Sequence, residues 1–245
     1  MNREFGLIVI GDEILRGKRH DCHFDAFRKI LDERHLALAW LQILPDDPDL
    51  LTCRLKTSME EGRPVFSCGG IGATPDDHTR RCAALAANLP LVSHATAVAE
   101  ITAQFGAEAY PNRIRMAELP EGCELIPNPL NRIPGFSLNH HHFLPGFPEM
   151  AHPMARWVLD NQYAAQVEPE REMSIKVYGG HESGLVPLME QLAAEWPNFK
   201  LFSLPRMGSI PFIELGFRGQ GDLRPTFHAL CHGIESLGLR YEQTR

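Results

Sequence analysis

The stretch FSCGGIGATPDDHTR, residues 66–80, joins a short apolar run to a loop with three glycines and two adjacent aspartates. The apolar run is typical of a buried strand, and the residues from Asp76 onward are typical of a helix. Gly69, Gly70 and Gly72 have no Cβ, so their backbone N–H groups are able to approach an anion closely. The stretch therefore predicts a strand, a phosphate-binding loop and a helix whose N-terminus faces the phosphate.

The same alternation of strands and helices continues on both sides of this stretch. Strands are predicted within residues 5–11, 37–44, 64–68 and 137–144, and helices within 21–36, 46–62, 76–89, 93–109 and 149–163. Strands that alternate with helices form a parallel sheet covered on both faces. The expected fold class is α/β, as three α/β/α layers with a mostly parallel sheet.

A second, smaller domain is expected at the C-terminal end. Residues 164–172, AAQVEPERE, are charged and have no hydrophobic periodicity, which predicts a linker. Beyond it the pattern predicts strand, helix, strand, strand and helix, a small α+β unit with two helices on a short sheet. We therefore expect domains at residues 1–165 and 172–245.

The composition narrows the class of partner. The chain has 245 residues and a formal net charge of -7, which disfavours nonspecific binding to nucleic acid or to an anionic membrane. No apolar run is long enough to span a bilayer. The six cysteines form no CxxC pair, so we expect reduced thiols and a cytoplasmic protein. The expected partner is a small molecule.

Three loops, at residues 11–17, 69–77 and 145–150, each follow a predicted strand. In an open parallel sheet, the loops at the carboxyl ends of the strands line the ligand crevice. We therefore expect these loops to meet at one edge of the sheet, although they lie far apart in the sequence.

The aspartates of the central loop require an explanation, because Asp76 and Asp77 would repel a phosphate. A hard divalent cation such as Mg²⁺ between them would remove this repulsion. Asp12 and Glu13, in the first loop, could supply further metal ligands or a general base. The alternative is that Asp76 and Asp77 only cap the third helix, since acidic residues are common at helix N-termini.

Three segments carry a family resemblance. GDEILRGKRHD (11–21), GGIGATPDDHT (69–79) and LPGFPEM (144–150) resemble the signature segments of the molybdopterin-binding MoaB/Mog-like domain family. The resemblance is strongest to its competence/damage-inducible protein A (CinA) branch, and LPEGCELIPNP (119–129) resembles the stretch between the last two segments. The residues after the linker resemble the small second domain of the same branch.

The resemblance implies a three-layer α/β/α fold, a homo-oligomer, and a phosphate-bearing pterin or nucleotide as ligand, with molybdopterin as one candidate. Some members of the branch are metal-dependent pyrophosphatases that act on ADP-ribose-like molecules. On this basis Asp76, Asp77 and Glu13 are the implied catalytic residues, with a divalent metal at Asp76 and Asp77. The implied ligand-binding residues are Gly11, Asp12, Gly69, Gly70, Gly72, Thr74, Thr79, Asn128, Pro145, Gly146 and Glu149.

The sequence also departs from the branch. It has His23 where the branch usually has asparagine, and Ala73 where it usually has proline. Longer relatives continue into an amidohydrolase domain where this sequence ends, so the resemblance implies a stand-alone form without deamidase activity. Two functions stay open: a metal-dependent hydrolase that cleaves a pyrophosphate, and a protein that binds molybdopterin or a nucleotide without chemistry.

Other candidate residues predict structure rather than chemistry. His140, His141 and His142 are adjacent, and neighbours on a strand point to opposite faces, so we expect a solvent-exposed hairpin rather than a metal site. Cys68 is expected to be a buried structural thiol. Glu182 and Ser183 are expected to begin the first helix of the second domain.

Overall fold

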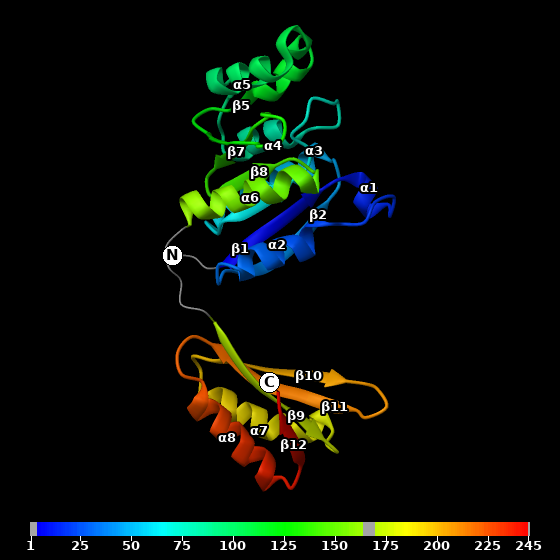
Figure 1. The fold of residues 1–245 in the computed structure, drawn as a ribbon, viewed down its shortest axis with the longest axis vertical. Coiled ribbons are helices and arrows are strands. Elements are labelled where there is room, and N and C mark those ends of the chain that lie inside the picture. The colour runs from blue at the N-terminus through cyan, green and yellow to red at the C-terminus, as the bar shows by residue number, and fades with distance from the viewer. Residues whose placement is uncertain (1–3, 164–169, 245) are drawn as a thin grey trace. The chain divides into compact units, whose positions relative to one another are not determined.

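The computed structural model describes residues 4–163 and 170–244, and the chain divides into two compact units, residues 1–167 and 168–245 (Figure 1). The first unit contains a six-stranded sheet in the order β2-β1-β3-β8-β7-β6. Its strands are β1 (Glu4–Ile10), β2 (Ala37–Leu44), β3 (Val65–Cys68), β6 (Glu124–Ile126), β7 (Gly135–Leu138) and β8 (His141–Leu144). The strands β2, β1, β3 and β8 are parallel, and β7 is antiparallel to both of its neighbours. The expected α/β fold is confirmed.

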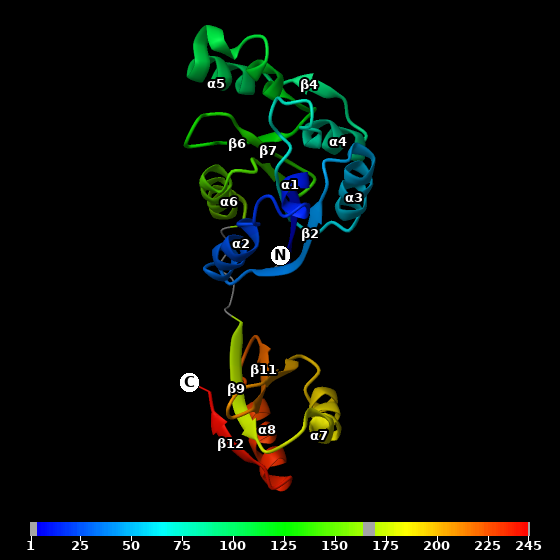
Figure 2. The same ribbon diagram turned by 90° about the vertical axis from the view of Figure 1, so that its right-hand side faces the viewer.

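Helices cover both faces of this sheet. Figure 2 shows α2 (His23–Asp32) and α6 (Pro148–Gln162) on one side, and α3 (Pro48–Glu60) and α4 (Thr79–Ala86) on the other. The continuous apolar run of β1 follows from this arrangement. Its alternate residues enter two different cores, one packed against α2 and α6 and the other against α3 and α4.

Elements outside the main sheet were only partly predicted. The helix expected at 93–109 is α5 (Ala95–Phe105), followed by two short 3₁₀ helices, η1 (Gly106–Ala109) and η2 (Arg113–Ala117). The strands β4 (Leu91–Ser93) and β5 (Glu118–Pro120) form a small separate sheet. A one-turn helix, α1 (Asp12–Leu15), lies in the first glycine loop. These short elements carry too few residues for a periodic pattern.

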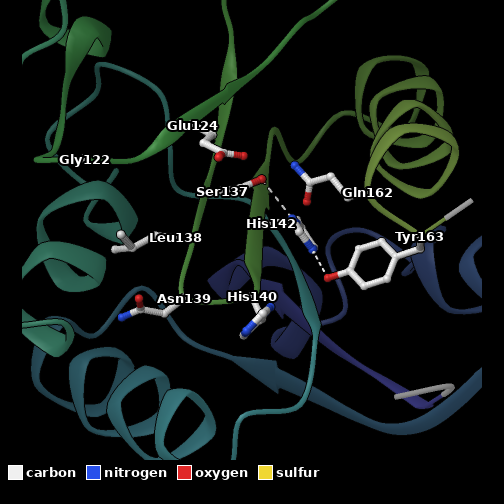
Figure 3. A pocket seen from close by; sticks show the side chains of 9 residues that line it. All are labelled: Gly122, Glu124, Ser137, Leu138, Asn139, His140, His142, Gln162 and Tyr163. Atoms are coloured by element: carbon white, nitrogen blue, oxygen red, sulfur yellow. Dashed lines mark hydrogen bonds between the residues drawn. The ribbon is translucent and has the colours of Figure 1, made fainter. Parts of the chain in front are cut away.

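The histidine hairpin is buried, so the expectation of solvent exposure is wrong for two of the three residues. His141 and His142 are 0% and 1% exposed. His141 Nε2 is hydrogen-bonded to Ser58 Oγ at 2.8 Å, on the face covered by α3. On the other face His142 is hydrogen-bonded to Ser137 Oγ at 2.9 Å and to Tyr163 Oη at 2.8 Å (Figure 3). Because both imidazoles find polar partners, burying them is tolerated.

The second unit is an α+β domain, as predicted. Its elements are β9 (Arg171–Tyr178), α7 (Glu182–Glu195), β10 (Lys200–Arg206), β11 (Phe212–Gly219), α8 (Arg224–Ser236) and β12 (Arg240–Gln243). The antiparallel sheet has the order β10-β11-β9-β12. The strand β12 was not predicted, and β9 begins inside the expected linker; residues 164–169 of that linker lie outside the described residues. The expected helix start at Glu182 is confirmed.

Two composition-based expectations bear on these described ranges. All six cysteines are free thiols, and Cys68 is fully buried at the end of β3, where burial raises the pKa of its thiol. None of the helices in residues 4–163 and 170–244 combines the length and the apolar character that a membrane span requires.

Candidate functional site

The three glycine-containing loops lie at the carboxyl ends of β1, β3 and β8, which are parallel neighbours. The N–H of Gly69 donates to the carbonyl oxygen of Leu144, at 3.0 Å. A Cβ on Gly69 would lie 2.4 Å from the carbonyl oxygen of Ile10, and a Cβ on Gly146 would lie 3.4 Å from the Cα of Gly69. The expectation that the loops meet at one edge of the sheet is confirmed.

The loop after β3 adopts a backbone that favours glycine. Gly69 and Gly70 have φ angles of +112° and +68°, a region that residues with a Cβ rarely adopt. Thr79 holds this conformation: its hydroxyl donates to the carbonyl oxygen of Gly69 at 3.0 Å, and its N–H donates to that of Gly70 at 2.9 Å. Thr79 is fully buried, so it fixes the loop from the interior of the protein.

Several N–H groups of this loop have no acceptor. Within residues 4–163 and 170–244, the backbone N–H groups of Gly70, Ile71 and Gly72 donate no hydrogen bond. The N-termini of α4 and α6 follow the second and third loops, and the capping residues His78 and Phe147 make no side-chain cap hydrogen bond. Successive free N–H groups beside helix N-termini are the usual protein components of an anion site.

Asp77 closes the loop on itself. Its Oδ2 accepts the N–H of Thr74 at 2.8 Å and also the hydroxyl of Thr74. The interpretation of Asp77 as a cap of α4 is therefore wrong, because its side chain bonds backward along the chain. Of the two aspartates, Asp76 is solvent-exposed and Asp77 is half-buried.

A further carboxylate, Asp46, lies at the same edge and was missed in the sequence. It accepts the N–H of Asp12 at 2.9 Å, and its own N–H donates to Asp12 Oδ1 at 3.4 Å. Burial raises the pKa of the Asp46 carboxyl. Three neighbouring carboxylates, those of Asp12, Glu13 and Asp76, raise it further by their negative charge. Its position in the sequence could have identified it, because Asp46 follows the strand 37–44 just as the three loops follow their strands.

The donor set fits a metal only in part. Among residues 4–163 and 170–244, no three histidine, cysteine or acidic side chains are grouped to hold a metal ion. Mg²⁺ in proteins often uses one or two carboxylates and completes its shell with phosphate oxygens and water. The exposed carboxylate residue Asp76 fits a hard cation that is shared with a phosphate ligand, and it does not fit an ion held by the protein alone.

Asn128 follows β6, which runs in the same direction as β8, so it lies at the same edge of the sheet. Its Oδ1 accepts the N–H of Leu130 at 3.0 Å, whereas its buried Nδ2 has no partner within the described residues. A buried amide with unused donors is costly unless another group accepts from it. Of the remaining implied ligand residues, Pro145 is buried, and Gly146 and Glu149 are exposed at the start of α6.

His23 connects the third loop to α2 and was noted in the sequence only as a departure. Its Nε2 is 3.2 Å from the carbonyl oxygen of Gly146, so this ring nitrogen carries the proton and donates. Burial lowers the pKa of His23 more than this hydrogen bond raises it. Its ring also packs at right angles to that of His152, with centroids 5.3 Å apart. A neutral imidazole therefore fixes the position of the Gly146 carbonyl.

The hairpin pocket drawn in Figure 3 is separate from this site. It has a volume of about 530 Å³ and includes His142 and Tyr163 in its wall. His142 stands near the amino end of β8, whereas Gly146 follows the carboxyl end of that strand. The loop edge, where the glycines and free N–H groups gather, is the better candidate for phosphate.

Arg80 supports the phosphate loop from inside the protein and was also missed. Its guanidinium is buried and donates to three carbonyl oxygens, of Gly72 at 2.8 Å, of Glu118 at 2.9 Å, and of Arg115. Burial lowers its pKa. It joins the loop to η2 and to the first residue of β5.

Replacing Arg80 with methionine is expected to lower the free energy of unfolding of the first unit by about 2 kcal/mol, because three carbonyl oxygens lose the charged donor that joins them. The matched control is Arg81→Met, since Arg81 is exposed and its loss is expected to cost less than about 0.5 kcal/mol. Urea unfolding of the two variants checks this. Equal stability of the two variants would contradict the structural role of Arg80.

Comparisons with known proteins agree with this geometry. The family model described as a probable molybdopterin binding domain matches residues 6–164. A CinA-like protein of Syntrophotalea carbinolica is 28% identical over 232 residues, covering 91% of this chain and 55% of that protein. A CinA-like protein of Citrifermentans bemidjiense is 31% identical over 250 residues, covering 91% and 58%.

A solved structure has the same fold as the first unit. The protein CinA from Thermoplasma acidophilum, described as having unknown function, superposes with a TM-score of 0.60 at 26% identity, covering 65% of this chain and 97% of that one. The chain belongs to the molybdopterin-binding domain family, as a CinA-like member of its MoaB/Mog group. It spans a little over half the length of the two curated relatives that it matches.

Proposed function

We propose that the first unit binds a phosphate-bearing pterin or nucleotide at the carboxyl edge of its sheet. The observation that carries this proposal is the run of free N–H groups at Gly70, Ile71 and Gly72, beside the N-terminus of α4. Such groups are suited to phosphate oxygens. The unused amide donors of Asn128 are suited to a further acceptor on the ligand, such as a ring carbonyl.

The negative charge at this edge requires a cation. Asp12 and Asp76 lie close enough to Asp46 that their charges raise its pKa. A bare phosphate beside these three carboxylates would be repelled. In the proposal a divalent metal such as Mg²⁺ binds Asp76 together with the phosphate, and it supplies the positive charge that offsets this repulsion. Asp77 keeps the loop closed through Thr74 instead of binding the metal.

We further propose that the bound ligand is hydrolysed at a pyrophosphate, with an ADP-ribose-like molecule as substrate. A water oxygen forms a bond to one phosphorus, the bridging P–O bond breaks, and the second phosphate leaves with the bond's electron pair. The proton of the water passes to a carboxylate, for which Glu13 is the candidate because it lies in the first loop, beside Gly11. The products are two phosphate monoesters.

The alternative is binding without chemistry, and one observation favours it. The carboxylates at this edge do not converge in groups of three in the described part of the chain, and Asp77 is already hydrogen-bonded to Thr74. The two functions differ in whether ADP-ribose is cleaved after it binds.

Asp76→Asn is expected to make ADP-ribose binding the same in Mg²⁺ as in EDTA, because the amide lacks the charge that a hard cation requires. Thermal unfolding should change little, since Asp76 is exposed. Asp32→Asn is the matched control. Asp32 is an exposed aspartate at the C-terminal end of α2, and its variant should bind as the wild type does.

Titration calorimetry with ADP-ribose, and analysis of the products by ion-exchange chromatography, test the two parts separately. Release of AMP and ribose phosphate supports hydrolysis. If ADP-ribose binds but no AMP is released in Mg²⁺, Mn²⁺ or Co²⁺, the binding function is supported and the hydrolase function is contradicted. If neither ADP-ribose nor AMP binds with or without metal, the nucleotide form of the proposal fails.

A further inference from the structure

The sheet of the second unit has one covered face and one open face. Both of its helices, α7 and α8, pack on the same face, as Figure 1 shows. Along β9 and β11 the residues that contact them alternate with residues that do not: Ile175, Val177 and Leu215 are buried against the helices. The intervening residues, such as Lys176 and Glu214, are half-buried and point to the opposite side.

Aromatic rings lie on the open face, on three neighbouring strands. Tyr178 on β9 and Phe212 on β11 are directly paired in the sheet, and their ring centroids are 6.0 Å apart. Phe202 on β10 lies on the same face, because a Cβ on its paired residue Gly216 would come within 2.7 Å of the Phe202 ring. None of the three rings belongs to the hydrophobic core of this unit.

Cations accompany the rings. By strand register the open face carries five basic side chains, those of Lys176, Lys200, Arg206, Arg218 and Arg240. Within the described ranges none of them forms an ion pair. The same face carries three glutamates, Glu172, Glu214 and Glu242, so its charge is positive in a chain whose formal net charge is -7.

Two of the cations already contact the rings. Lys176 Nζ is 5.2 Å from the centroid of Phe212, and Arg240 Cζ is 5.0 Å from that of Tyr178. In the row that crosses all four strands, Arg206 and Arg240 flank the paired rings of Phe212 and Tyr178. At the usual spacing of neighbouring strands this row is roughly 14 Å long.

We propose that this open face binds single-stranded nucleic acid, with bases stacked on Phe212 and Tyr178 and phosphates bound by the flanking arginines. Aromatic side chains on the central strands of a four-stranded sheet stack two or three bases in known RNA-binding domains. Stacking accepts every base, and unpaired cations bind the backbone, so the recognition is tolerant of sequence. The net charge of the whole chain disfavours nonspecific binding, but it averages over this locally positive face.

The experiment is a fluorescence anisotropy titration of the full chain with a labelled oligothymidylate of about twelve nucleotides. Excess ADP-ribose is present so that the proposed site of the first unit does not contribute. We expect saturable binding in the micromolar range at about 50 mM salt, and much weaker binding at about 200 mM salt, because phosphate contacts release counterions.

Phe212→Leu is expected to weaken binding about tenfold, because leucine keeps the apolar bulk and loses the ring that stacks on a base. Arg206→Gln is expected to weaken binding less and to flatten its dependence on salt. Two matched controls should bind as the wild type: Tyr110→Leu, an exposed ring of the first unit, and Arg224→Gln, an arginine paired with Asp222. Circular dichroism establishes that each variant is folded.

Three results would overturn the proposal. One is the absence of binding at low salt up to about 100 μM protein, which spans most of the usual nonspecific range. Another is unchanged affinity in both Phe212→Leu and Arg206→Gln, which would place the oligonucleotide elsewhere. The third is a loss of affinity in Arg206→Gln alone with full displacement by inorganic polyphosphate, which would make the face a general polyanion surface.

Discussion

Lowering the pH from about 7 to about 5 is expected to remove about 4 kcal/mol from the free energy of unfolding of the first unit. The cause is the burial of two uncharged imidazoles. Burial lowers the pKa of His141 to about 4 and that of His142 to about 3, from the ordinary value of 6.5. Below pH 6.5 the unfolded chain therefore binds protons that the folded chain does not.

The sign of the effect follows from this difference in proton binding. The stabilising contribution is fully present above pH 6.5 and is lost as the pH falls toward the folded pKa values. Each histidine contributes about 2 kcal/mol over the interval down to pH 5, at 1.36 kcal/mol for each pKa unit. Each buried imidazole keeps a hydrogen-bond partner, Ser58 on one face of β8 and Tyr163 on the other.

Urea unfolding in a Trp196→Phe background measures the effect in the first unit, because the remaining tryptophans, Trp40 and Trp157, both lie there. His142→Gln is expected to reduce the pH slope clearly, since one of the two imidazoles with the largest pKa shifts is removed. His140→Gln is the matched control, because His140 is the exposed neighbour. The same pH slope in His142→Gln as in the wild type would contradict this account.

The sequence predicted the sheet well because its signal is local. The run 5–11 is apolar without interruption, which requires burial on both faces, and β1 has this environment. The glycine-rich loops were predicted for the same reason: a strand followed by glycines and a helix start is a pattern within fifteen residues. The convergence of the three loops then follows from the parallel arrangement alone.

What the sequence did not predict depends on partners that are distant along the chain. His141 is buried because Ser58, 83 residues away, supplies a hydrogen bond. Arg80 is buried because carbonyl groups of another segment, 35 and 38 residues away, accept from it. The polar character of such residues predicts exposure, and only the tertiary contacts reverse that expectation.

In the candidate site too, some features were predicted from the sequence and others depend on tertiary contacts. Its glycines were identified from their type and position, whereas the role of Asp77 depended on which atom it bonds. Its carboxylate accepts from Thr74 and does not cap α4, and no pattern in the sequence separates these two bonds. Asp46 could have been identified because it follows a predicted strand, but aspartates in turns are common, and Asp47 stands next to it.

Gly69→Ala is expected to lower the free energy of unfolding of the first unit by about 4 kcal/mol, from a strained φ together with a steric clash. The φ angle of +112° is rare for any residue with a Cβ, and the new methyl group would lie 2.4 Å from the carbonyl oxygen of Ile10. That oxygen belongs to the backbone of β1, which pairs with β2 and β3, so it has little freedom to move aside. The ends of β1 and β3 must separate.

Gly17→Ala isolates the clash from the backbone strain. Gly17 has a φ of +68°, and a Cβ there would meet nothing within 4 Å, so this change is expected to cost only about 1 kcal/mol. Urea unfolding and ADP-ribose titration are compared for both variants. Because separation of β1 and β3 displaces the free N–H groups of the loop, Gly69→Ala should also lose ligand binding at temperatures where it stays folded, while Gly17→Ala binds normally. Equal stability and equal binding in the two variants would mean that the close approach of Gly69 to Ile10 contributes nothing to the site.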